Sequence, residues 1–166
     1  MTPEQTSDID DRPDPRPAHG RPFVPAGFAP PSPPRMPAFW LEPLGPQHNE
    51  ADHAAWSSSN AHSHGTPGYP DGSWPHEMTA AENLAGLQMH ADHFARRLGF
   101  TYTVRSAADD DVIGCVYIYP SRDPKVDAEV QSWVRVSHAD LDVDLWRTVS
   151  EWLDQWPFAA VDYAAR

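Results

Sequence analysis

The residues that decide the fold read Asp111-Val112-Ile113-Gly114-Cys115-Val116-Tyr117-Ile118-Tyr119, a stretch that is almost continuously apolar after its first residue. An apolar run of this length predicts a central strand that is covered on both of its faces. Cys115, the only cysteine, lies inside the run, where a cysteine usually acts as a small buried hydrophobic residue. The chain is therefore expected to fold around a sheet with further layers on both sides.

The segments on either side of this run predict further strands. Residues 100–105 alternate apolar and polar side chains, and a polar turn joins them to the central run as a hairpin. Residues 128–136 alternate in the same way. A helix over residues 143–155 ends before Pro157, and residues 158–163 form a last short strand. Because a helix connects the last two strands, those strands should be parallel.

The N-terminal side of the domain is predicted to contain one strand, residues 38–44, and two helices. The first helix covers residues 47–57. The second covers residues 80–98 and begins with a capping box that Thr79 and Glu82 form. Gly99 is expected to end this helix in a left-handed conformation. The whole chain is thus predicted to be an α/β (α+β) protein with a mixed sheet of about five strands and three helices.

Composition separates residues 1–37 from the rest, because prolines concentrate there and few residues could build a core. This part is predicted to be a disordered Pro-rich tail before a domain of residues 38–166. The formal net charge of −12 argues against binding to nucleic acid or to a membrane surface. No secretory signal and no membrane-spanning segment can be identified, so we expect a cytoplasmic protein.

The order of the predicted elements resembles that of the GNAT family of N-acetyltransferases up to its fifth strand. Residues 111–118 are similar to the third strand of that family, which often reads xxIGxVxL. Residues 129–137 resemble its fourth strand, and residues 142–155 resemble the helix that follows. The resemblance covers residues 39–163 and implies a GNAT-like fold and transfer of an acyl group from acetyl-CoA to a small-molecule or peptide amine.

In that family the thioester of acetyl-CoA lies where the fourth strand splays from the fifth, and amides at the next helix start hold the pyrophosphate. The resemblance therefore assigns acetyl-CoA binding to Val134, Val136, Ser137 and His138. The same stretch lacks the glycines of the family pattern Q/R-x-x-G-x-G/A. Its helix start instead carries three carboxylates, those of Asp140, Asp142 and Asp144. These groups would cap the helix and repel a pyrophosphate.

Three residues are catalytic candidates by the same resemblance. Glu129, on the strand that often supplies the general base, is the first, and Tyr117 and Tyr119 would contribute beside it. The loop of residues 60–76 would cover the acceptor amine, and its side chains His64, Tyr69 and Trp74 would contact the substrate. No histidine spacing matches a metal motif, so no metal site is predicted. His90 and His93, three residues apart on the helix of residues 80–98, are expected on its solvated flank.

Two functions remain open at this point. One is a GNAT-like N-acetyltransferase that uses acetyl-CoA, and the other is a catalytically degenerate GNAT-fold binding module that no longer binds acetyl-CoA. Only three residues follow Tyr163 in the sequence, so the sheet is expected to keep an open edge. An open edge strand invites pairing, and a homodimer through it is compatible with either function.

Overall fold

The structure of the chain, a computed structural model, describes residues 14–57, 67 and 78–166. The elements of these residues are β1 (Phe39–Pro43), the 3-10 helix η2 (Pro46–His48), α1 (Asn49–Ser57), α3 (Ala80–Arg96), β2 (Phe100–Ser106), β3 (Val112–Pro120), β4 (Ala128–Val134), the 3-10 helix η3 (Val136–Leu141), α4 (Asp142–Leu153) and β5 (Val161–Tyr163). The predicted fold class is confirmed.

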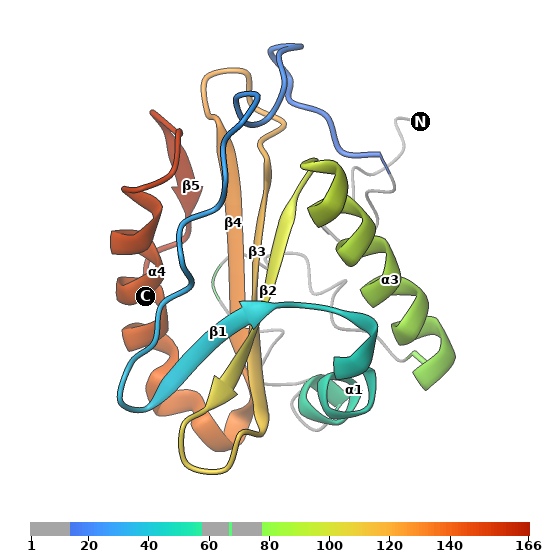
Figure 1. Cartoon of the computed structure of the whole chain (residues 1–166). Coiled ribbons are helices and arrows are strands. Elements are labelled where there is room, and N and C mark those ends of the chain that lie inside the picture. The colour runs from blue at the N-terminus through green and yellow to red at the C-terminus, as the bar shows by residue number, and fades with distance from the viewer. Residues whose placement is uncertain (1–13, 58–66, 68–77) are drawn as a thin grey trace, which may run out of the picture.

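The five strands form one mixed sheet in the order β1-β2-β3-β4-β5. The first four strands pair antiparallel with their neighbours, and β5 pairs parallel with β4, as the connecting helix α4 requires. Figure 1 shows the sheet between α4 on one side and α1 and α3 on the other. Alternate side chains of each strand therefore enter two different cores.

The two cores differ in character. On the α4 side, strand residues such as Val116, Ile118 and Val130 pack against the apolar face of α4. On the side of α1 and α3, buried polar and aromatic side chains are mixed with apolar ones, and Tyr117, Tyr119 and Trp133 belong to this second core. Every residue of β3 is buried, as its continuous apolar run predicts.

Helix α3 ends differently from the prediction. The left-handed residue is Arg97, with φ 64°, and not Gly99. Gly99 is needed for another reason: a Cβ at this position would lie 2.4 Å from Cε1 of Tyr119. The glycine therefore allows the chain to pass the Tyr119 ring, a contact that no local pattern of the sequence indicates.

The segment from Asp14 to Pro37 contains no helix or named strand, yet part of it is packed on the domain. Phe23 and Val24 are buried in the core on the α4 side. The Phe23 ring stacks on Phe158 at 5.0 Å between centroids. Figure 1 shows the segment, in blue, running along the molecule between α3 and α4. Its packing was not predicted from composition, and the domain boundary near residue 38 stays a prediction.

Among the residues that the structure describes, no helix is both long and apolar enough to cross a membrane.

Candidate functional site

Strands β4 and β5 pair over a short distance only. Ala128, Glu129 and Val130 of β4 are opposite the three residues of β5. Strand β4 then continues to Val134 without a partner from β5. This separation creates the gap in which the family resemblance places the thioester of acetyl-CoA.

The side chain of Arg166 fills this gap. Its exposed fraction is 2%, although arginine is almost never fully buried without a partner. Nη2 donates to the carbonyl oxygen of Ser132 at 2.8 Å and to Ser132 Oγ at 3.2 Å, two residues beyond the last paired residue of β4. Nε donates to Asp142 Oδ2 at 2.8 Å, and Nη1 donates to the carbonyl oxygens of Ala164 and Pro67.

A hydroxyl pair lies beside this guanidinium. Tyr163 OH and Ser132 Oγ are 2.5 Å apart, and the Arg166 guanidinium lies 5.8 Å from the centroid of the Tyr163 ring. Burial raises the pKa of the Tyr163 phenol to about 12, while the bond to Ser132 and the charge of Arg166 work in the opposite direction. Tyr163 is therefore neutral at physiological pH, and the gap is closed by a network of side chains.

The start of α4 is acidic, and its three carboxylates have different environments. Asp142 is the counterion of Arg166 and is mostly buried, with 21% of its side chain exposed. Asp144 is 61% exposed and 3.7 Å from Arg147, and Asp140 is exposed. All three lie where the positive end of the helix dipole stabilises negative charge. An anionic ligand at this helix start would compete with groups of the chain itself.

The four residues predicted to bind acetyl-CoA lie along this region. Their side chains are not suited to bind acetyl-CoA, which leaves only their backbone groups for such a contact. Val134 is buried in the core on the α4 side, so its side chain is not available to a ligand. Val136, Ser137 and His138 follow in η3, where Ser137 Oγ and His138 Nδ1 are 2.8 Å apart. The positive charge next to this region is that of Arg166, which is already paired with Asp142.

The described residues therefore do not fit acetyl-CoA in the position that the family uses. The thioester position is taken by Arg166, which donates to the Ser132 carbonyl oxygen. In the family the pyrophosphate lies at the start of this helix, whose first turn here carries Asp142 and Asp144. Like charges ~4 Å apart repel by a few kcal/mol at an effective dielectric near 20. Moving Arg166 out of the gap would also leave Asp142 without its counterion.

The three predicted catalytic residues do lie together, on the opposite face of the sheet. Tyr119 is directly opposite Glu129 in the β3–β4 register, and Tyr117 is opposite Gln131. Both tyrosines belong to the core on the side of α1 and α3. Glu129 is partly buried, and the Tyr117 hydroxyl accepts a bond from Trp133 Nε1 at 3.4 Å. A carboxylate beside two phenols could accept a proton from a bound ammonium group.

Two histidines that the sequence placed on a solvated flank of the helix are buried against this group. Nδ1 of His90 and Nδ1 of His93 lie 2.7 Å and 2.8 Å from the Tyr119 hydroxyl. Their exposed fractions are 2% and 0%. The two are three residues apart on α3, so the helix presents both to the sheet. A sequence signal existed in this spacing, but the partner Tyr119 is remote in sequence.

The predicted substrate residues His64, Tyr69 and Trp74 lie outside the described residues, so their role stays a prediction. Within residues 14–57, 67 and 78–166, no group of three or more His, Cys, Asp or Glu side chains could hold a metal ion.

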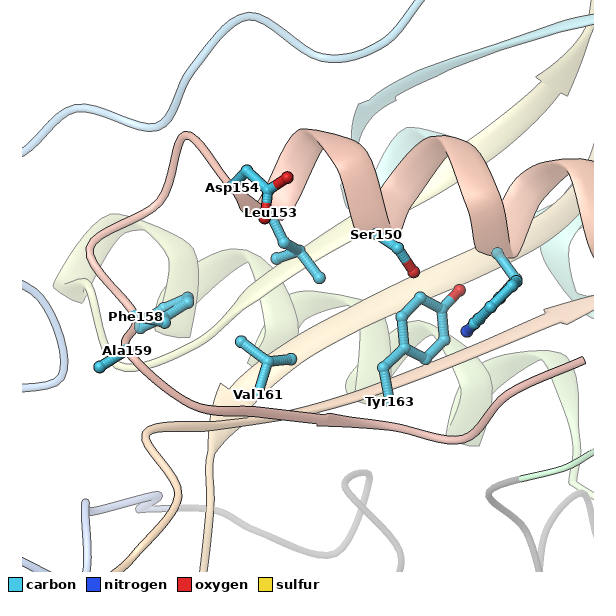
Figure 2. Close-up of a pocket in the computed structure, with 8 residues that line it drawn as sticks. Ser150, Leu153, Asp154, Phe158, Ala159, Val161 and Tyr163 are labelled. Atoms are coloured by element: carbon cyan, nitrogen blue, oxygen red, sulfur yellow. The ribbon is translucent and has the colours of Figure 1, made fainter.

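A cavity of about 310 Å³ lies between α4 and β5, on the other face of the sheet from Glu129. Figure 2 shows Ser150 and Leu153 of α4 and Val161 and Tyr163 of β5 extending into the space between the two elements. No sequence pattern indicated this cavity, because it depends on how far α4 stands from the edge of the sheet.

No protein-family model matches the chain, and no curated protein matches it. Solved structures do match. One is a putative GnaT-family acetyltransferase from Bordetella pertussis, with a TM-score of 0.55, 12% identity and coverage of 75% of this chain and 73% of that chain. Another is a putative ribosomal-protein-serine acetyltransferase from Vibrio cholerae, with a TM-score of 0.57, 11% identity and coverage of 77% and 70%.

A third match is RimL, the ribosomal L7/L12 alpha-N-protein acetyltransferase, in complex with coenzyme A. Its TM-score is 0.55, its identity is 13%, and the match covers 72% of this chain and 66% of that chain. At identities this low the matches establish the fold, which is that of the GNAT acetyltransferases.

Proposed function

We propose that this chain is a GNAT-fold binding module that does not use acetyl-CoA in the manner of the family, and that its ligand is a small-molecule or peptide amine. The observation that carries the proposal is the buried guanidinium of Arg166 between β4 and β5. An enzyme that admits acetyl-CoA at this point needs the space between the two strands, and here the chain fills that space itself.

The choice of an amine as the ligand follows from the negative net charge of the protein. The formal net charge is −12, and an acidic surface raises the local concentration of cations and lowers that of anions such as coenzyme A. The acidic start of α4 adds to this preference at the position where the family binds a pyrophosphate.

The second candidate function is an N-acetyltransferase that transfers an acyl group from acetyl-CoA to an amine. Two observations favour it: the fold shared with known acetyltransferases, and the placement of Glu129 beside Tyr119 and Tyr117 on one face. In that case Glu129 would take the proton of the acceptor ammonium. This function requires that Arg166 leave the gap.

Calorimetric titration of acetyl-CoA decides between the two. The binding-module proposal predicts no binding by the natural protein at acetyl-CoA concentrations up to about 1 mM. It also predicts none by the double variant Asp140→Asn/Asp144→Asn, because this variant removes two exposed charges and leaves the Arg166–Asp142 pair in the gap. Asp142 is kept in the design for that reason.

The opposite result is equally informative. Micromolar binding by the natural protein would overturn the binding-module proposal. Acetylation of an amine that is lost in Glu129→Gln, with acetyl-CoA binding unchanged, would then establish the acetyltransferase.

A further inference from the structure

The cavity between α4 and β5 has the size of a small-molecule site. Its lining mixes aromatic and aliphatic side chains with polar groups, and consists of Trp146, Ser150, Leu153, Asp154, Phe158, Ala159, Val161 and Tyr163. Sites for small ligands typically have volumes of about 300 Å³ or more. At about 30 Å³ per water molecule, this cavity has room for roughly ten water-sized groups.

The helix spacing explains why the cavity exists. Leu145, Val149 and Trp152 of α4 are buried against the sheet, which leaves the adjacent stripe of Trp146, Ser150 and Asp154 facing the β5 edge. Residues four apart lie on one side of a helix, so these three side chains form a row. At about 1.5 Å per residue, the row is roughly 12 Å long. A ligand in the cavity would be elongated along α4.

The lining of the cavity carries negative charge and no positive charge among the described residues. Among the described residues that line the cavity, Asp154 is the only acidic one, and none is an arginine, lysine or histidine. Tyr163 does not add a charge, because burial keeps its phenol protonated. Figure 2 shows Asp154 at the end of α4, next to the loop that carries Phe158 and Ala159. A negative charge at one end of an aromatic-lined cavity favours an organic cation.

A second polar group lies at the other end of the row. The indole nitrogen of Trp146 is buried and has no hydrogen-bond acceptor among the described residues. Because this nitrogen is not accessible from the cavity, Trp146 contributes an aromatic wall to the site and not a hydrogen bond to a ligand.

We propose that this cavity binds an elongated organic amine, with its ammonium group at Asp154 and its apolar body along α4, against the Trp146 and Tyr163 rings, whose centroids lie 6.5 Å apart and which contact each other at an angle of 60°. The inference rests on the proposed function and names its site. It places ligand binding on the face of the sheet opposite to Glu129, so it is independent of the residues that the acetyltransferase would use.

The test uses 2-phenylethylamine as the probe and 2-phenylethanol as its uncharged match. Binding is followed in a proton–nitrogen NMR spectrum of the full chain, through the indole signal of Trp146, which is assigned by its disappearance in Trp146→Phe. We expect the amine to move this signal saturably. The alcohol should bind at least threefold more weakly, because it has the same ring but no charge to pair with Asp154.

Variants test the assignment of the site. Asp154→Asn should weaken amine binding about threefold and leave the alcohol unchanged. Glu151→Gln, an exposed position on the same helix outside the cavity lining, is the matched control and should change neither. Ala159→Phe, which places a ring into the cavity from an exposed position, should abolish binding of both probes.

Each outcome decides something. An indole signal that stays in place, equal affinity for amine and alcohol, or an equal loss in Glu151→Gln and Asp154→Asn would overturn the inference. If neither acetyl-CoA nor the amine binds, the cavity proposal fails while the loss of the acetyl-CoA site stands. If both bind, the cavity proposal stands and the binding-module proposal fails.

Discussion

Replacement of Arg166 by alanine is the perturbation with the clearest expected effect. The side chain is 2% exposed, and the substitution removes the only counterion that the structure shows for the Asp142 carboxylate among the described residues. It also removes the donor that satisfies the Ser132 carbonyl at 2.8 Å. Two buried acceptors would therefore lose their partner in one step.

The magnitude follows from the burial of the two partners. Breaking a buried ion pair by removing one side costs about 3–5 kcal/mol when the remaining charge is fully buried. Asp142 is 21% exposed, so water can solvate it in part, and we expect a loss of about 2–3 kcal/mol in the free energy of unfolding. For a domain of this size that corresponds to a fall in melting temperature of roughly 5–10 °C.

Urea unfolding followed by tryptophan fluorescence measures this loss. Arg147→Ala is the matched control, because Arg147 is an arginine of α4 that is 62% exposed and lies 3.7 Å from Asp144. Exposed pairs of this kind contribute about 0–1 kcal/mol. If Arg166→Ala is no more destabilising than Arg147→Ala, the guanidinium does not close the gap in solution, and the argument against acetyl-CoA binding fails with it. A double-mutant cycle with Asp142→Ala isolates the pairwise term.

Three further predictions test other parts of the structure. Tyr119→Phe removes the hydroxyl bonded to His90 and His93 and should cost about 1–3 kcal/mol of unfolding free energy in the same urea assay, whereas a solvated flank would predict almost none. Phe23→Ala should cost about 2–4 kcal/mol, because the ring is 9% exposed and stacked on Phe158; a loss below about 0.5 kcal/mol would mean that the N-terminal segment is not packed on the domain. The raised pKa of Tyr163, about 12, favours the protonated phenol in the folded state, so its contribution is complete below pH 10 and is lost as the pH rises from 10 to 12; Tyr163→Phe should flatten this part of the stability profile.

The sequence was sufficient for the fold because its strongest signals are local. The apolar run of β3 is found where it was predicted, and Thr79 is the N-cap of α3, where its hydroxyl accepts from the Glu82 amide at 3.1 Å. In the β3–β4 register Glu129 lies on the face that it shares with Tyr117 and Tyr119. Periodicity assigns side chains to faces, and the pairing of β3 with β4 then brings these three together.

The sequence failed where a residue depends on a remote partner. Gly99 was expected to cap α3, but its contact with the ring of Tyr119, twenty residues further along the chain, explains why it is a glycine. His90 and His93 were assigned to the surface because a helical pattern does not show which polar side chains find a buried hydroxyl. Phe23 is of the same kind, since proline-rich surroundings hide an aromatic residue that the core accepts.

The acidic start of α4 shows how a correct observation can receive an incomplete explanation. From the sequence, Asp140, Asp142 and Asp144 are three equivalent repulsive charges. The structure divides them, because Asp142 is the buried partner of Arg166 while the other two face solvent. A gap between β4 and β5 without a ligand would leave the Ser132 carbonyl and Asp142 Oδ2 without a donor, and Arg166 donates to both with one side chain. The charge at the helix start and the closed gap are therefore one feature, and a change to either residue alone should expose the other.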